Sequence, residues 1–310
     1  MGGARGSILS HGATKIFQRP EDRRLSPTTK AVFGPRWEFF NAAWRRVREG
    51  IRHLVWGIVY QIYERRLGAQ VAAAPKPRHV GIILDGNRRH ARANGLNAQE
   101  TYTKGAAKLD DILAWSAELG IPMVTLWVFS PDNLSRPEAE IGGIFGALET
   151  KMRQLVDDPH IHSRGVRVTA IGRRETLPAS LLAAISAAES ATRDNTQLTI
   201  TLAVGYGGRE EITDAVRAMI LASAAEGLTA EQAAAAVTPD AIRRHLYVAD
   251  MPDPDLIIRT SGEIRLSGFL LWQSVHSELF FCDLNWPAFR RIDYLRAVRS
   301  FQLRHRRFGA

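Results

Sequence analysis

The residues that could do chemistry begin with DGNRRHA at residues 85–91, which follows the apolar run HVGIIL. A carboxylate at the end of a strand is a good ligand for a hard cation, and Mg²⁺ usually takes one or two carboxylates plus phosphate oxygens. Gly86 lets the backbone approach a ligand closely, and amides at the start of a following helix suit an anion. Two adjacent arginines favour a bound anion, but this stretch alone is also compatible with an ordinary Asp-Gly turn.

Three further polar loops follow apolar runs. The loop SPDNLSRP at 130–137 offers donors to phosphate, although taken alone it fits a capped helix entry better. The loop GYGGR at 205–209 fits a strand-to-helix turn. The loop RTSGEIRLSG at 259–268 combines two arginines with hydroxyl groups, a plausible cradle for a diphosphate because arginine binds phosphate oxygens in pairs. Glu278, further on, is either a second carboxylate for the cation or a solvated residue at the start of a strand.

These loops must be positioned by the elements around them. Short β-branched runs alternate with helix-length segments from His79 onward, which predicts a single α/β domain with a mostly parallel six-stranded sheet flanked by helices. The predicted strands are 80–84, 123–129, 166–171, 198–204, 255–259 and 278–282. The predicted helices are 101–119, 138–157, 178–193, 209–226, 238–247 and 288–305. Because ligands bind beyond the carboxyl ends of such strands, we expect one rim that carries Asp85, Ser130, Gly205 and Arg259.

The N-terminal part of the chain differs in composition from the rest. Residues 1–66 hold 13 Lys/Arg against 5 Asp/Glu, which is +8 of the net charge of +9. Residues 1–32 are polar and aperiodic, which predicts a disordered tail. Residues 33–67 repeat apolar side chains at steps of three or four, which predicts a basic amphipathic helix. Residues 68–78 then indicate a linker to a folded domain over 79–310.

The basic helix leaves two interpretations open. It packs on its own domain or on a second subunit, or residues 33–66 lie on an anionic membrane surface. The single cysteine, Cys282, excludes an internal disulfide framework and fits a reducing compartment. No apolar run reaches the roughly 18 residues of a membrane span. We therefore expect a cytoplasmic protein, with peripheral contact at the inner face of the membrane as an option, and no nucleic-acid partner because the excess charge lies outside the folded domain.

Taken in order, the loops resemble the motif set of the cis-prenyltransferases, the undecaprenyl diphosphate synthase family. The resemblance extends over residues 76–309. Its blocks are DGNRRHA, FSPDNLSR, YGGR and IRTSGE, followed by a Trp-Gln pair and Glu278. The stretches TSGEIRLSGFLLWQS and NWPAFRRIDYLRA are most similar to the short-chain (2Z,6E)-farnesyl diphosphate synthases of actinobacteria.

This resemblance implies a Mg²⁺-dependent transferase that condenses isopentenyl diphosphate with geranyl or farnesyl diphosphate, forms a new cis double bond and works as a homodimer. The catalytic residues it implies are Asp85, Asn87, Ser130 and Asn133. The residues it implies for the allylic diphosphate are Gly86, Asn87, Arg88, Arg89 and Arg136. Those it implies for isopentenyl diphosphate are Arg259, Arg265 and Ser267. Asp85 and Glu278 would hold Mg²⁺, with Glu278 in the neighbourhood of the partner subunit.

The sequence departs from the family pattern at three positions near the implied diphosphate sites. Tyr102 stands where most members have a histidine, His90 stands where they have an aromatic residue, usually tryptophan, and Ala98 replaces an arginine that often contacts the allylic diphosphate. These departures bear on phosphate affinity and product length rather than on the class of reaction.

A growing prenyl chain needs a dry tunnel, and the apolar helix that contains Ile144 and Leu148 could wall it. Val128 stands where long-chain members tend to have a smaller residue, so we expect it to narrow the tunnel and to stop elongation early. The predicted product is a short-chain Z-isoprenyl diphosphate such as (2Z,6E)-farnesyl diphosphate. The alternatives are a long-chain undecaprenyl or decaprenyl diphosphate synthase for the cell-wall lipid carrier and a non-catalytic scaffold subunit of the same family.

Overall fold

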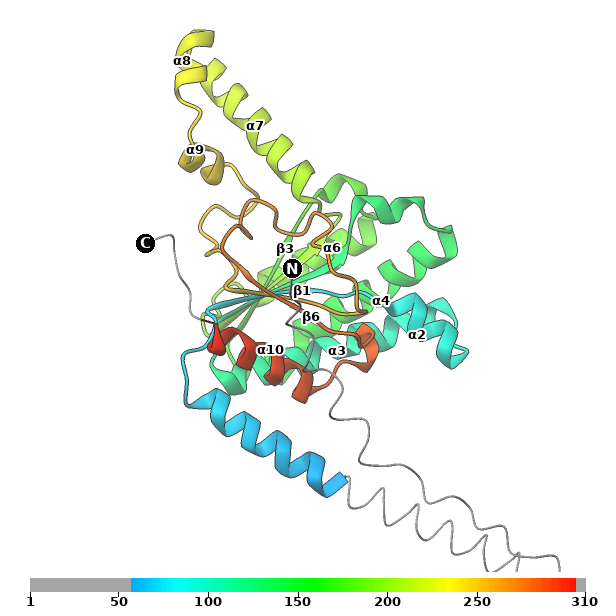
Figure 1. Ribbon diagram of the computed structural model, residues 1–310. Helices are drawn as coiled ribbons and strands as arrows, with labels where there is room; N and C mark the ends of the chain where they lie inside the picture. The colour runs from blue at the N-terminus through cyan, green and yellow to red at the C-terminus, as the bar shows by residue number, and fades with distance from the viewer. Residues whose placement is uncertain (1–56, 305–310) are drawn as a thin grey trace, which may run out of the picture. The chain divides into compact units, whose positions relative to one another are not determined.

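The computed structural model describes residues 57–304 of the chain (Figure 1). Contacts divide the chain into two units, Met1–Ile62 and Tyr63–Ala310. Residues 57–62, which belong to the first unit, are helical. The predicted tail over 1–32 and most of the predicted basic helix lie outside the described residues.

The second unit begins with helical backbone over residues 63–72, so the predicted linker over 68–78 is wrong in its first half. Leu67 and Val71 are buried, and Gln302 donates hydrogen bonds from its side chain to the carbonyl oxygens of Val71 at 2.9 Å and Pro75 at 3.0 Å. The alanine-rich composition that indicated a linker is equally favourable to a helix, and packing decided between them.

Six parallel strands form one sheet with the order β3-β4-β2-β1-β5-β6, which confirms the predicted α/β class. The strands are β1 His79–Ile83, β2 Met123–Phe129, β3 Val166–Ile171, β4 Leu198–Val204, β5 Leu256–Arg259 and β6 Glu278–Phe281. All five residues of β1 and all four of β5 are buried, as expected for strands with elements packed on both faces. The core therefore lies along the centre of the sheet.

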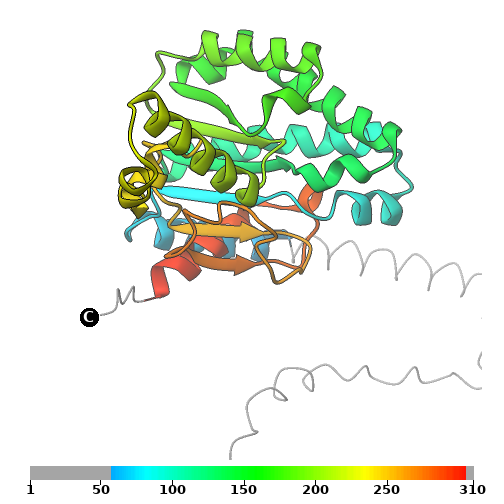
Figure 2. The same ribbon diagram turned by 90° about the horizontal axis from the view of Figure 1, so that it is seen from above.

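Helices cover the sheet and connect its strands (Figures 1 and 2). The longer ones are α3 Ala98–Leu119, α4 Glu138–Asp157, α6 Ala179–Ala191, α7 Gly208–Ala225 and α10 Arg291–Leu303. The shorter ones are α2 Asn87–Asn94, α5 Pro159–Ser163, α8 Ala230–Ala235 and α9 Pro239–Arg244. Helix α4 packs between α3 and α6, and α10 contacts β5, β6 and α3.

Two of the shorter helices, α5 and α8, were not predicted from the sequence, and α2 was expected only as a helix start after Gly86, without bounds. Each has eight residues or fewer, which is too short for a clear helical period in the apolar residues. Helix α10 also starts three residues later than predicted, because Trp286–Ala288 forms a 3-10 turn with a proline at its start. The strands β2, β3 and β4 have the predicted bounds.

Candidate active site

Loops at the carboxyl edge of the sheet enclose a polar cavity of about 420 Å³. The predicted rim residues Asp85, Ser130 and Arg259 all line it, the first two after β1 and β2 and the third as the last residue of β5. Gly205 does not. It follows β4 at the same edge, but a side chain there would be directed at Thr176 and the Arg173 backbone instead. All four predicted rim residues therefore lie at the same edge of the sheet, but only three of them line the cavity.

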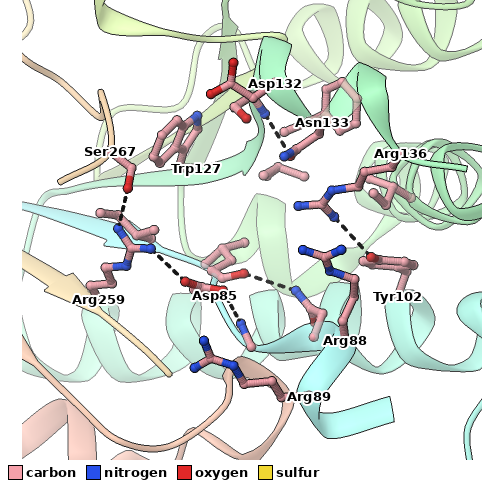
Figure 3. A pocket seen from close by; sticks show the side chains of 18 of the residues that line it. Asp85, Arg88, Arg89, Tyr102, Trp127, Asp132, Asn133, Arg136, Arg259 and Ser267 are labelled. Carbon is pink, nitrogen blue, oxygen red and sulfur yellow. Dashed lines mark hydrogen bonds and ion pairs between the residues drawn. The ribbon is translucent and has the colours of Figure 1, made fainter. Parts of the chain in front are cut away.

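Asp85 lies near the centre of this cavity (Figure 3). Its Oδ2 pairs with Nη2 of Arg259 at 2.8 Å, and its Oδ1 accepts a hydrogen bond from the Gly86 amide at 2.6 Å. Burial opposes ionisation of the carboxyl group, but the hydrogen bond and charge of Arg259, with the Gly86 amide, outweigh it and hold the pKa of Asp85 below its ordinary value. The group is therefore an anion at neutral pH.

Arg259 connects Asp85 to the loop between β5 and β6. Its guanidinium is buried, with 5% of the side chain exposed, and its Nη1 donates to the Arg265 carbonyl at 2.6 Å and to Ser267 Oγ at 2.8 Å. The Nε of Arg265 donates to the same hydroxyl at 3.1 Å. The structure therefore brings together the three residues that the resemblance implied for isopentenyl diphosphate.

A second group of arginines lies across the cavity from Arg259 (Figure 3). Arg88 and Arg89 belong to α2, and Arg136 follows the 3-10 turn Pro131–Ser135 after β2. Arg136 donates to Glu140 at 2.9 Å, and Arg88 lies 3.8 Å from the same carboxylate. The structure therefore brings Arg88 and Arg136 together at Glu140, whereas Arg89 extends from the same helix to Ser261 and Glu263, beside Arg265.

Tyr102 of α3 joins this second group (Figure 3). Its hydroxyl donates to Glu140 at 2.8 Å and accepts from Arg136 at 3.3 Å. Burial, followed by the neighbouring carboxylate, raises the pKa of Tyr102 to about 12, so the hydroxyl keeps its proton at any working pH. A tyrosine here can thus donate a hydrogen bond where most family members offer a histidine. The other two departures, His90 and Ala98, are not among the residues that line the cavity.

Two amide side chains, those of Asn87 and Asn133, also line the polar cavity. Asn87 donates to the Leu84 carbonyl at 3.1 Å, while its Oδ1 is buried without a hydrogen-bond partner among the described residues. Asn133 accepts from the Ser130 amide at 3.1 Å, so its Oδ1 caps the turn after β2. The unpaired oxygen of Asn87 is the better candidate for contact with a bound ligand, because a buried acceptor without a partner is unfavourable.

Glu278 lies away from Asp85 within this chain. It is the first residue of β6 and pairs with Arg304, whereas Asp85 follows the last residue of β1. The register aligns Ile83, Arg259 and Phe281 across the sheet, so Glu278 lies about 10 Å back toward the opposite edge. One cation cannot be shared by Asp85 and Glu278 of the same chain.

A smaller, mainly apolar cavity of about 60 Å³ adjoins the polar one. The predicted tunnel residues Val128, Ile144 and Leu148 all line it. The residues that line both cavities are Leu84, Asn87, Tyr102, Val128 and Ile144. The two spaces therefore meet at the level of Asn87 and Tyr102.

Several site residues were missed by the sequence analysis. Glu140 and Glu263 pair with the arginines, Arg92 lines the polar cavity, and Lys151 and Trp286 line the apolar one. Glu140 stands four residues after Arg136 at the start of α4, a spacing that indicates a helical ion pair. The others are brought in by tertiary packing and have no comparable local signal.

The part of the chain that carries this site matches a known protein family. The model of the family described as putative undecaprenyl diphosphate synthase matches residues 83–309. The chain belongs to this family. An isoprenyl transferase of Deinococcus radiodurans is 55% identical over 257 residues, which are 83% of this chain and 92% of that protein. A (2Z,6E)-farnesyl diphosphate synthase of Thermobifida fusca is 51% identical, covering 81% and 97%.

Solved structures agree with this membership. The chain is similar to lavandulyl diphosphate synthase of Lavandula x intermedia, crystallised in complex with dimethylallyl diphosphate, with a TM-score of 0.69 and 34% identity over 76% of this chain and 99% of that one. The predictions of the family, the fold and the class of transferase are thereby confirmed. Within residues 57–304, none of the helices has the length and apolar character to span a membrane.

Proposed function

We propose that this enzyme condenses isopentenyl diphosphate with an allylic diphosphate, geranyl or farnesyl, and forms a new cis double bond. The observation that carries the proposal is the placement of Asp85 between two groups of arginines at the mouth of an apolar cavity. Two anionic substrates that react with each other need positive charge on both, and a prenyl tail needs a dry space.

Each diphosphate has its own set of arginines in this proposal, and Arg89 is assigned to the allylic diphosphate although it shares Glu263 with Arg265. Arg88, Arg89 and Arg136, with the backbone at Gly86, bind the allylic diphosphate, which leaves when the allylic carbon ionises. Arg259, Arg265 and Ser267 bind the diphosphate of isopentenyl diphosphate. Fixed cations around the departing diphosphate stabilise the negative charge that develops on it in the transition state.

The donor set around Asp85 fits Mg²⁺. Its carboxylate is one-third exposed at the cavity, and no cluster of three acidic, histidine or cysteine side chains exists in the described part of the chain. One carboxylate with the remaining ligands from phosphate and water is a common arrangement for Mg²⁺. A bound Mg²⁺ would neutralise charge on the leaving diphosphate. Asp85 is held for this role by Arg259 and the Gly86 amide.

Asn87 and Ser130 are proposed to assist the last step, in which the condensed intermediate loses a proton and the new cis double bond forms. Both line the polar cavity, and the unpaired Oδ1 of Asn87 is an acceptor at the junction with the apolar cavity. The reacting carbons of two substrates held by the two arginine groups would meet near this junction. The experiment for this role is Asn87→Asp and Asn87→Ala, for which we expect a loss of kcat greater than any change in KM.

The proposed assembly is a homodimer, in which Glu278 of a second chain would complete the cation site, since Glu278 of the same chain lies at the opposite edge of the sheet. The proposed location is the cytoplasm, with residues 33–66 in contact with a membrane as the open alternative. Sedimentation of the full-length protein with and without anionic vesicles separates these possibilities.

The proposed product is a short-chain Z-isoprenyl diphosphate such as (2Z,6E)-farnesyl diphosphate. The small apolar cavity and the likeness to the Thermobifida fusca synthase support it. The deciding experiment incubates protein, Mg²⁺ and labelled isopentenyl diphosphate with geranyl or farnesyl diphosphate and sizes the dephosphorylated products. We expect a C15 product from geranyl diphosphate that is lost in Asp85→Ala. Products of C50 or longer would favour the long-chain alternative, and no product would favour the scaffold alternative.

Val128 gives a first test of product length. It lies at the junction of both cavities, so Val128→Ala removes two methyl groups from the wall of the apolar space. We expect products longer than those of the unaltered enzyme by at least one isoprene unit, with incorporation of isopentenyl diphosphate preserved. An unchanged product length would show that Val128 is not the residue that limits the chain.

A further inference from the structure

A buried lysine stands in the wall of the apolar cavity. Lys151 of α4 has 7% of its side chain exposed, and the cavity around it is otherwise formed mainly by apolar side chains. Its ammonium group donates to both carboxylate oxygens of Asp110 on α3, at 2.5 and 2.6 Å. Buried lysines are rare because removing their charge from water costs free energy, so a functional role for Lys151 is worth testing.

The position of this ion pair relative to the polar site follows from the two helices. Helix α3 runs from Tyr102, which lines both cavities, to Asp110, a rise of about 12 Å. Helix α4 runs alongside from Ile144, which also lines both cavities, to Lys151, a rise of about 10 Å. Lys151 therefore lines the apolar cavity at the end remote from the arginines, and its ammonium group is held by Asp110, whose own side chain is 52% exposed.

We propose that Lys151, held in place by Asp110, forms a charged floor that ends the growth of the prenyl chain. The inference rests on the proposed function. A tail that grows away from the diphosphate sites would reach this floor, and further growth would have to displace the buried Lys151 side chain and its ammonium group from Asp110. Asp110 is half exposed and can be solvated, but a displaced Lys151 would carry its charge into the apolar cavity without a partner, so the barrier is electrostatic as well as steric.

The charge and the bulk of the side chain can be separated by substitution. Lys151→Met keeps the length of an unbranched side chain but has no partner in Asp110, so it can move aside for a tail. Lys151→Arg keeps a cation that Asp110 can hold. We expect products at least one isoprene unit longer from Lys151→Met and Lys151→Ala, and unchanged products from Lys151→Arg.

Lys108 offers a matched control. It pairs with Asp111 on the same helix at 2.7 Å, and neither residue lines the polar or the apolar cavity. Lys108→Met removes a lysine–aspartate pair of the same kind and is expected to leave product length unchanged. A merely structural role of Lys151 would lower the unfolding temperature of Lys151→Met without any change in products.

The test has two readouts. The first is the product-length distribution with labelled isopentenyl diphosphate. The second is calorimetric binding of unreactive prenyl thiodiphosphates with C10, C15 and C20 tails, which needs no turnover. Relative to the unaltered protein, Lys151→Ala is expected to bind the C20 compound about tenfold more tightly, the effect of burying roughly two more methylene groups, and the C10 compound equally well.

The outcomes separate the inference from the proposed function. Longer products, or a gain confined to the longest thiodiphosphate if the protein shows no turnover, would support the charged floor. Unchanged products with unchanged tail-length dependence of binding would overturn it, even if the unaltered protein is an active synthase. Absence of turnover alone would count against the proposed function only, because the binding series still measures the depth of the cavity.

Discussion

Two glutamates hold four of the site arginines before any substrate is bound. Glu140 pairs with Arg88 and Arg136, and Glu263 pairs with Arg89 and Arg265. Hydrogen bonds from Arg89 and Arg265 keep the pKa of Glu263 below its ordinary value, so it is ionised at neutral pH. The pairs stand near the surface and each is weak. Their consequence is orientation, because guanidinium groups that are already in place lose less freedom when a diphosphate binds.

Tyr102 can be tested at this scale. Tyr102→Phe removes the donor to Glu140 and one contact of Arg136, so the arginine is held less firmly. We expect KM for the allylic diphosphate to rise roughly 3- to 10-fold, the effect of one modest hydrogen bond, with kcat nearly unchanged.

Tyr102→His is the matched variant, because it keeps a polar ring that can donate to Glu140. It should retain an allylic KM close to that of the unaltered enzyme. Steady-state kinetics with the allylic substrate varied would decide. A drop in kcat at constant KM in Tyr102→Phe would contradict the positioning role and place the hydroxyl in the chemical step.

At the scale of elements, the loop between β5 and β6 is held in an unusual backbone conformation. Ser261, Ser267 and Leu270 all have positive φ, at 76°, 51° and 46°. Phe269 anchors the loop, since it is fully buried and stacks on Trp127 with ring centroids 5.4 Å apart. Positive φ in such residues costs about 1–3 kcal/mol each and is retained where the surroundings require it. The loop therefore presents Ser267 to the cavity in one fixed arrangement.

The turn between β1 and α2 contains Gly86, whose backbone conformation and close contacts predict the effect of adding a side chain there. Gly86 has φ of 98°, and a side chain there would come within 2.8 Å of the Asn285 Cα. Gly86→Ala is expected to lose activity and about 1–3 kcal/mol of unfolding free energy from the backbone conformation, with a further loss from the clash. Chemical denaturation and the product assay measure the two effects.

Gly95 is the control for this substitution. It ends α2 with φ of 65° and has nothing within 4 Å of an added side chain. Gly95→Ala should therefore lose stability from the backbone alone and keep its activity. Equal loss of activity in both variants would mean that the contact of Gly86 with Asn285 does not shape the site.

At the scale of the whole molecule, a buried histidine links the two central strands β1 and β2 to the segment before β5. His79, at the start of β1, donates from Nδ1 to the Pro252 carbonyl at 2.7 Å and accepts at Nε2 from the Thr125 hydroxyl of β2 at 2.8 Å. A carbonyl can only accept, which fixes the neutral tautomer. Burial lowers the pKa of His79 to about 4, despite the Pro252 hydrogen bond that opposes the shift.

This histidine predicts a pH dependence of stability. Between pH 6.5 and 4 the unfolded chain binds a proton at His79 and the folded protein does not, so stability falls as the pH falls through that window. The loss amounts to about 3 kcal/mol when it is complete. His79→Gln, which can donate and accept at the same two partners, should flatten this part of the profile.

Unfolding by urea at several pH values between 7 and 4 measures this prediction. The unaltered protein should show a steeper loss of unfolding free energy than His79→Gln across the window. Parallel profiles for the two proteins would mean that His79 is protonated in the folded state and that another group causes the acid loss.

Much of the fold and of the candidate site could be predicted from residue types and their spacing along the sequence. The bounds of β2, β3 and β4 follow from apolar β-branched runs between breakers, and that signal lies within each segment. The meeting of Asp85, Ser130 and Arg259 also followed from sequence, because the carboxyl ends of parallel strands share an edge. The motifs around them identified the family.

Three features could be seen only in the tertiary structure. They are the strand order, the position of Glu278 at the edge of the sheet opposite to Asp85, and the absence of Gly205 from the lining of the cavity. It also brought Lys151 to Asp110, 41 residues away, and placed this lysine in the wall of the apolar cavity. These features depend on which surfaces of distant segments meet. These long-range contacts are determined by packing over the whole core. Neither segment contains a periodic pattern or motif from which a single sequence could predict the contact.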